Sequence, residues 1–74
     1  MLFVHIEGFL EVARLGSVSR AADALYVTQP TLTARLHSLE RDMGHQLFVR
    51  TRHGMRLTDE GRAFMPYAER AVRA

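Results

Sequence analysis

A chain of 74 residues without a single cysteine has to fold on its apolar side chains alone. Domains of this size bury little core and often gain stability from disulfides or bound zinc. The missing thiols exclude a disulfide framework, a thiolate zinc site and a cysteine nucleophile. Apolar residues make up 47% and charged residues 24% of the chain, as in ordinary globular domains. We therefore expect one small, well-packed domain, suited to a reducing compartment.

Apolar residues at helical spacing predict a first helix over residues 2–15. Six of them share one face: Leu2, Phe3, Ile6, Phe9, Leu10 and Ala13. Gly16 can adopt the left-handed conformation that ends a helix. A short second helix is expected over about residues 20–25, with Ser19 as its N-cap.

A third helix is predicted after a tight connection over residues 26–28. It would begin at Thr28 or Gln29, with Pro30 in the first turn, where a missing N–H group costs nothing. Gly44 would end it. Its apolar residues repeat on one narrow face: Leu32, Leu36, Leu39 and Met43. The rest of this helix is therefore expected to lie outside the core.

The pattern changes after residue 47 and predicts a β-hairpin. Residues 49–52 and 55–58 would pair as two short strands, joined by a two-residue loop of His53 and Gly54. Two apolar residues would attach the hairpin to the core: Phe48 and Leu57. Thr58 would then cap a fourth helix that runs to the end of the chain.

Positive charge concentrates between Gly44 and Thr58. The net charge of the whole chain is only +2, but this segment has no aspartate or glutamate and contains Arg50, Arg52 and Arg56. A local basic block on a nearly neutral domain indicates a polyanion partner. The alternative is a solvated hairpin with incidental arginines, and charge alone does not choose between the two.

The second and third predicted helices, joined by a short turn, form a helix-turn-helix pattern. One face of the third helix would stay exposed and fit a DNA major groove. The exposed residues carry short or amide side chains: Gln29, Pro30, Thr31, Thr33 and Ala34. Gln29 can donate and accept together, as pairing with adenine requires. The predicted fold is mainly α: a winged helix-turn-helix with a three-helix core and a two-strand wing, followed by a C-terminal helix.

One long run of sequence resembles a known family. The run GSVSRAADALYVTQPTLTARLHSLERDMGHQLFVRT, continued by RLTDEGRAF, resembles the DNA-binding domain of LysR-type transcriptional regulators. The resemblance covers essentially the whole chain. Its most selective elements are Ser19-Arg20-Ala21-Ala22, Thr28-Gln29-Pro30, Leu39-Glu40 before Gly44, Leu47-Phe48, Arg50-Thr51-Arg52, and Leu57-Thr58 before Gly61.

The resemblance implies a winged helix-turn-helix domain over residues 1–58 and a linker helix for dimerisation over residues 59–74. It also implies a C-terminal domain that binds a small-molecule effector, which this chain lacks. We therefore expect a fragment without a cofactor of its own. It would bind a double-stranded DNA operator as a homodimer on an inverted repeat, and the full-length protein would form higher oligomers in the bacterial cytoplasm.

The resemblance also implies roles for single residues. It assigns contacts with the DNA bases to Gln29, Pro30, Thr31 and Thr33, and contacts with the DNA backbone to Thr28, Arg50 and Arg52. Many members have arginine where this chain has Ala34, whereas the next residue here, Arg35, lies nearer the buried side of the helix. The alternative role for Arg50 is an ion pair with Glu40 or another acid, which would hold the wing. The complete candidate DNA-binding set is Thr28, Gln29, Pro30, Thr31, Thr33, Arg35, Arg50, Arg52 and His53.

The predicted fourth helix carries an apolar stripe that indicates pairing with a second copy of the chain. Its candidate dimerisation residues are Phe64, Tyr67, Ala68, Ala71 and Val72. An apolar stripe left exposed on so small a monomer usually marks an interface. The alternative is that the stripe packs on the first helix of the same chain, and one edge can serve each purpose. Pro66 lies inside this helix and removes one backbone hydrogen bond.

Other function classes find little support in the sequence. The chain has no nucleophile–base pair, phosphate-binding loop or metal cluster, so an enzyme is not expected. The spacing of His37, His45 and His53 fits no common tetrahedral metal motif. No apolar run approaches the length of a membrane span. A winged helix used for protein–protein contact is the alternative to DNA binding, but such an interface would prefer exposed aromatic residues at the start of the third helix.

Overall fold

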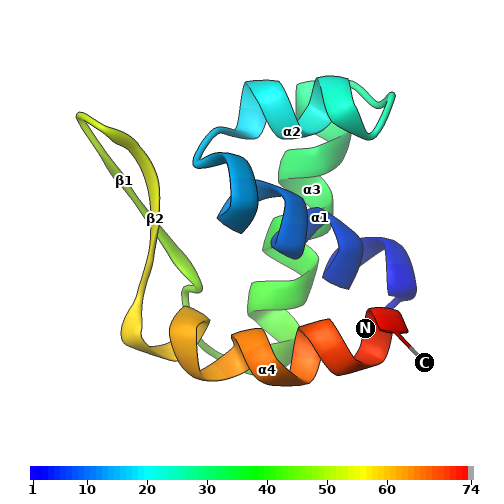
Figure 1. Cartoon of the computed structure of the whole chain (residues 1–74), viewed down its shortest axis with the longest axis vertical. Helices are drawn as coiled ribbons and strands as arrows, with labels where there is room; N and C mark the ends of the chain where they lie inside the picture. The colour runs from blue at the N-terminus through cyan, green and yellow to red at the C-terminus, as the bar shows by residue number, and fades with distance from the viewer. Residues whose placement is uncertain (74) are drawn as a thin grey trace.

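A computed structural model describes residues 1–73 of the chain. The elements follow in the order α1 (Phe3–Leu15), α2 (Val18–Ala24), α3 (Gln29–Met43), β1 (Phe48–Thr51), β2 (Gly54–Leu57) and α4 (Asp59–Arg73). α1 packs against α2, α3 and α4, and the two strands form a hairpin at one side of the helices (Figure 1). We call residues 48–57 the wing. The architecture is the predicted winged helix-turn-helix.

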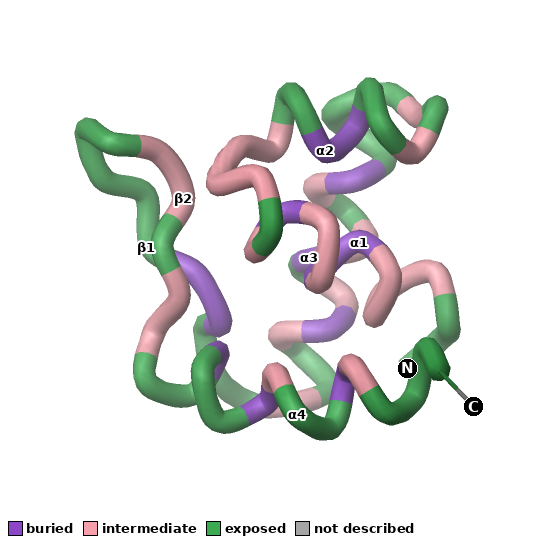
Figure 2. The backbone as a smooth tube through the Cα atoms, in the orientation of Figure 1, coloured by how far each residue is buried: buried purple, intermediate pink, exposed green. Residues whose placement is uncertain are grey.

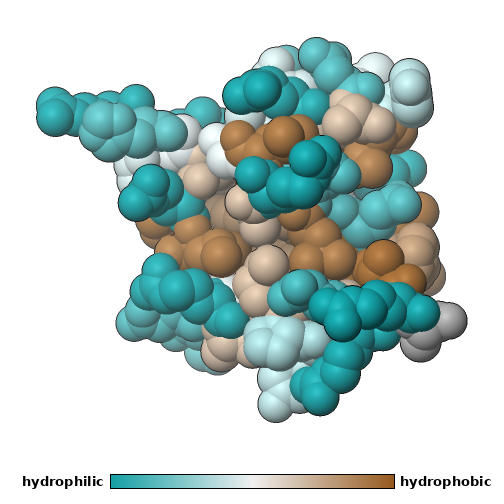
Figure 3. Space-filling model, viewed as in Figure 1, coloured by the Kyte–Doolittle hydropathy of each residue, from teal (hydrophilic) through white to brown (hydrophobic). Residues whose placement is uncertain are grey.

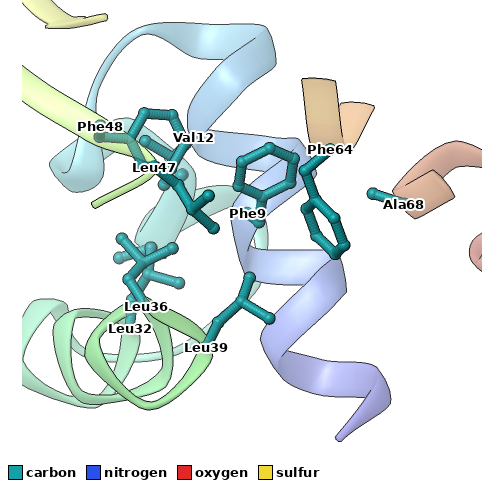
Figure 4. Close-up of a cluster of buried hydrophobic side chains, with 11 residues drawn as sticks. Phe9, Val12, Leu32, Leu36, Leu39, Leu47, Phe48, Phe64 and Ala68 are labelled. Atoms are coloured by element: carbon teal, nitrogen blue, oxygen red, sulfur yellow. The ribbon is translucent and has the colours of Figure 1, made fainter. Parts of the chain in front are cut away.

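The hydrophobic core connects α1 to α3, α4 and the wing. Phe9 is fully buried, and its ring centroid lies 5.3 Å from that of Phe48 and 5.2 Å from that of Phe64 (Figure 4). Aromatic pairs at this distance stabilise a core beyond the area they bury. The predicted stripe of α3 contributes buried Leu32, Leu36 and Leu39 and half-buried Met43. The wing and α4 are therefore held by the same core as the helix-turn-helix.

The buried face of α1 differs from the predicted one. Gly8 and Val12 are buried beside Phe9, whereas Leu2 and Phe3 are 61% and 54% exposed. Because three helices pack around the middle of α1, its buried face is centred there and its first turn extends beyond the core (Figure 2). The prediction that Leu2 and Phe3 belong to the core face was wrong.

The N-cap of α2 is Ser17, not Ser19. The Ser17 hydroxyl accepts a hydrogen bond of 3.1 Å from the amide of Arg20, and the helix begins at Val18. Val18 packs against the core, whereas Ser19 is exposed in the first turn. The helix therefore starts two residues earlier than predicted, because this start brings an apolar side chain to the core.

The wing turns at Arg52 and His53, one residue earlier than predicted. β1 and β2 are antiparallel, with Thr51 opposite Gly54. The Thr51 hydroxyl accepts from the His53 amide at 3.1 Å and donates to the Gly54 carbonyl at 3.0 Å, which closes the turn. Gly54 is the first residue of β2 and has a φ of +108°. The glycine is thus needed in the strand and not in the loop.

α4 continues through Pro66 to Arg73. The Thr58 hydroxyl accepts from the Gly61 amide at 3.0 Å, as predicted for a cap, and donates to the Gln46 carbonyl at 2.7 Å. These bonds attach the start of α4 to the segment that precedes the wing. Within residues 1–73, no helix combines the length and the apolar character that crossing a membrane requires.

Candidate nucleic-acid interface

The first turn of α3 presents a polar surface because the apolar residues of the helix face inward. The Thr28 hydroxyl accepts from the Thr31 amide at 3.3 Å and donates to the Thr31 hydroxyl at 3.0 Å, which caps the helix. The predicted contact residues of this turn are all exposed: Thr28, Gln29, Pro30 and Thr31. Thr33 is half-buried one turn later. Short side chains at a helix start allow another surface to approach closely.

A groove lies where the first turns of α2 and α3 meet the wing. We call it the α2–wing groove; its lining is Gly16, Ser17, Val18, Ser19, Gln29, Arg50, Gly54 and Met55. Gln29 and Arg50 come from different elements, and the fold brings them to this one depression. An amide able to read a base and a guanidinium able to hold a phosphate are therefore adjacent.

A second groove, the α3–wing groove, follows α3 beside the wing. Thr33 and Arg50 both line it, together with residues of α3 and β1 such as His37 and Phe48. Arg50 therefore borders both grooves. Gln29, Thr33 and Arg50 form a continuous surface between the start of α3 and the wing.

Six of the predicted contact residues do not line these grooves: Thr28, Pro30, Thr31, Arg35, Arg52 and His53. Arg52 and His53 are exposed at the tip of the wing, which projects from the body and is hydrophilic (Figure 3). Arg35 is half-buried on α3 and lines neither groove. The wing tip is thus placed to reach a partner beside α3, whereas Arg35 is set apart from the surface that the fold assembles.

The arginines of the wing have no carboxylate partner among residues 1–73, in contrast to three arginines of the helices. Arg14 pairs with Glu11, Arg62 with Asp59, and Arg73 with Glu69. All three wing arginines are exposed: Arg50, Arg52 and Arg56. Their positive charge is therefore not compensated locally and can neutralise the charge of an anionic partner.

The contacts of Glu40 show whether it forms an ion pair with Arg50. Its carboxylate accepts hydrogen bonds from the backbone amides of Leu47 at 2.7 Å and Phe48 at 3.4 Å. The carboxylate thus holds the start of β1 on α3, and the alternative ion pair with Arg50 is not formed. Arg50 stays available at the border of the two grooves.

The predicted dimerisation residues divide between the core and the surface. Phe64 is 9% exposed and Ala68 is fully buried, so these two belong to the core of the protomer. Their side chains are not available to a second copy, which corrects that part of the predicted stripe. Tyr67, Ala71 and Val72 are exposed. The physical reason is that the inner edge of α4 packs on α1 and only its outer edge faces solvent.

Sequence reasoning missed the residues that shape the α2–wing groove. Ser17, Gly54 and Met55 line it, and none of them was a candidate contact. A signal was present in the run Gly-Ser-Val-Ser, whose small and hydroxyl side chains permit close approach. The contribution of Gly54 and Met55 depends on how the wing folds back onto the helices.

Comparison with known proteins places this geometry in a family. The family model described as "Bacterial regulatory helix-turn-helix protein, lysR family" matches residues 3–62. A curated relative, the HTH-type transcriptional regulator HdfR of Salmonella newport (strain SL254), is 45% identical over 64 residues, which are 86% of this chain and 23% of HdfR. The chain thus spans about a quarter of the length of the curated relatives it matches.

Two solved structures show the same fold. VV2_1132, a LysR family transcriptional regulator, is 40% identical, with a TM-score of 0.93 over 99% of this chain and 25% of its own. The CbnR_DBD–DNA complex is 37% identical, with a TM-score of 0.93 over 99% of this chain and 84% of the solved chain. The predicted resemblance is confirmed.

Proposed function

The chain belongs to the lysR family of bacterial regulatory helix-turn-helix proteins, and from this premise we propose that it binds double-stranded DNA with sequence specificity. The observation that carries the proposal is the placement of Gln29 and Arg50 on one groove. A duplex whose major groove receives the start of α3 brings a phosphate backbone to the wing. The CbnR relative, solved as a DNA complex, supports this assignment.

In the proposed complex, residues 1–58 bind DNA and α4 acts as the linker helix. Gln29, Pro30, Thr31 and Thr33 face base edges, and Thr28 contacts the backbone near the amide groups of the α3 start, which favour an anion. Arg50, Arg52 and His53 contact the phosphate backbone or the minor groove. Thr33 and Arg35 are half-buried, whereas the other candidate contacts are exposed. The contribution of Arg35 to binding depends on how deeply α3 enters the major groove.

The proposed assembly is a dimer through the outer edge of α4. Tyr67, Ala71 and Val72 are exposed there, and Leu2 and Phe3 add exposed apolar surface at the start of α1. The start of α1 and the end of α4 lie on the same side of the molecule in the view of Figure 1. A two-fold axis at this side gives each recognition helix one half of an inverted repeat. In the full-length protein, a further domain would bind a small effector and regulate transcription.

Selection from a random pool of double-stranded DNA tests the proposal. We expect enrichment of an inverted repeat by the parent chain, and loss of preference at one base pair per half-site with Gln29→Ala. Arg41→Ala serves as a control, because it removes one positive charge from the far end of α3 and leaves the candidate contacts of the helix-turn-helix in place. A pool that stays random with the parent chain would contradict DNA reading and favour a protein partner.

A further inference from the structure

The wing is attached to the rest of the molecule at two levels. At its base, the Leu47 amide donates to Glu40, and the Thr58 amide donates to the Leu47 carbonyl at 3.0 Å. Halfway to the tip, the Met55 amide donates to the Gly16 carbonyl in the α1–α2 connection at 3.0 Å. The second bond pairs one amide on the outer edge of β2, which faces away from β1. It also limits the angle that the wing makes with α2.

Gly54 is the point of closest approach in this second attachment. A Cβ atom at this position would lie closer than 3.0 Å to the Gly16 carbonyl oxygen, a distance that real Cβ atoms essentially never show. The obstacle is backbone and cannot rotate away as a flexible side chain does. The φ of +108° is also a conformation that residues with side chains rarely adopt. Only glycine allows β2 to lie this close to the α1–α2 connection.

This contact also determines where the wing arginines lie. Arg50 is paired with Met55 across the hairpin, and Thr51 is paired with Gly54. Arg52 and His53 form the turn directly before Gly54. A shift of β2 away from Gly16 would carry all of these residues with it. It would also widen the α2–wing groove, because Gly16 and Gly54 line that groove together with Gln29 and Arg50.

We propose that Gly54 is a positioning residue for DNA binding: by seating β2 on the Gly16 carbonyl, it sets the distance between the wing arginines and residues 28–31 at the start of α3, which we call the recognition turn. This inference rests on the proposed function. Gly54 has no side chain that could read a base or hold a phosphate. It acts by letting Gln29 and Arg50 engage one duplex at the same time, each with its own contact.

The test is Gly54→Ala, measured as binding to the selected operator over a series of salt concentrations. If one wing arginine in each protomer loses its phosphate, the slope of log K against log salt becomes shallower by about 2 for the dimer. The same relation gives a loss of about 30-fold in affinity at 0.15 M salt. The preferred base sequence should stay unchanged, because Gln29 still enters the major groove.

Gly44→Ala is the matched control. Gly44 has a φ of +77°, and a Cβ atom there would meet nothing within 4 Å. Alanine at this position, at the end of α3, would be strained by the positive φ but would not collide with any other atom. It should lower the melting temperature but keep the affinity and the salt slope. A second comparison uses the double variant Arg50→Ala/Arg52→Ala, in which Gly54→Ala should cause no further change of slope, because the residues it positions are gone.

The possible results separate the inference from the proposed function. A parent chain that binds no DNA at low salt would overturn the proposed function, and the inference with it. A parent that binds, together with Gly54→Ala that keeps the parental slope and affinity, would overturn the inference alone. If Gly54→Ala does not fold, the inference is tested by hydrogen exchange of the backbone amides in the parent chain. A Met55 amide that exchanges as slowly as that of Thr58 supports a seated wing, and one as fast as that of Arg52 contradicts it.

Discussion

Gln29 and Arg52 lie on different elements, and their removal should change DNA binding in different ways. Gln29→Ala should cost about 1–3 kcal/mol on the preferred site and relax the preference at one base pair per half-site. Arg52 is exposed at the wing tip and contacts the DNA backbone or the minor groove in the proposed complex, so Arg52→Ala should weaken binding to all sequences nearly equally. It should also flatten the salt slope by about one for each protomer.

Fluorescence anisotropy with matched and mismatched duplexes measures both effects. Arg41→Ala controls for the loss of one positive charge, since Arg41 lies in the last turn of α3, away from the recognition turn. Equal and sequence-independent losses from Gln29→Ala and Arg52→Ala would mean that Gln29 reads no base.

Glu40 holds the base of the wing on α3 with a single carboxylate. It accepts from two backbone amides at the start of β1. Glu40→Ala leaves these part-buried donors without their acceptor and should lower the free energy of unfolding by about 1–3 kcal/mol. Glu40→Gln keeps an acceptor oxygen and should cost less.

Urea denaturation of the free domain measures the effect of Glu40. The control is Glu60→Ala, which removes an exposed carboxylate 3.9 Å from His45 and should change stability by less than about 1 kcal/mol. Equal stability of Glu40→Ala and Glu60→Ala would contradict a role for Glu40 at the base of the wing.

At the scale of the element, α4 has two edges with different tasks. Phe64 and Ala68 complete the core, whereas Ala71 and Val72 face solvent. Ala71→Glu would place like charges near the two-fold axis of the proposed dimer and leave the core intact. One unpaired buried charge costs about 3 kcal/mol, and the dimer would hold two, so its dissociation constant should rise by at least about 100-fold.

Sedimentation velocity, with binding to half-site and full-site duplexes, measures this change. Ala63→Glu introduces the same charge at an exposed position nearer the start of α4 and should leave the dimer unchanged. Should Ala71→Glu remain as dimeric as the parent and keep its full-site affinity, another surface must form the dimer.

At the scale of the whole molecule, the distribution of charge matters more than its sum. The net charge is only +2, because 10 arginines stand against 8 aspartates and glutamates, but none of these acids lies in the wing. If each protomer neutralises three or four phosphates, the slope of log K against log salt should be roughly −5 to −7. Titrations between low and moderate salt measure this slope. A flat response would mean that the wing arginines do not hold the DNA backbone.

Local patterns in the sequence determined most of the secondary structure. The stripe of Leu32, Leu36 and Leu39 has the period of a helix, and the residues that cap or end a helix act on the turn beside them. The starts of α3 and α4 at Thr28 and Thr58 were therefore predictable. The exposed recognition turn followed from the same stripe, because a helix with one narrow apolar face leaves its other face free.

Only the tertiary structure decided how these elements meet. The buried face of α1 depends on three helices that surround it, so periodicity alone placed Leu2 and Phe3 in the core although they are exposed. The division of α4 into an inner and an outer edge has the same cause. Position 54 of the strand needs glycine because the Gly16 carbonyl, far away in the sequence, lies against it. Contacts between distant segments leave no periodic pattern along the chain. The sequence therefore predicted neither the α2–wing groove nor the attachment of β2 to the Gly16 carbonyl.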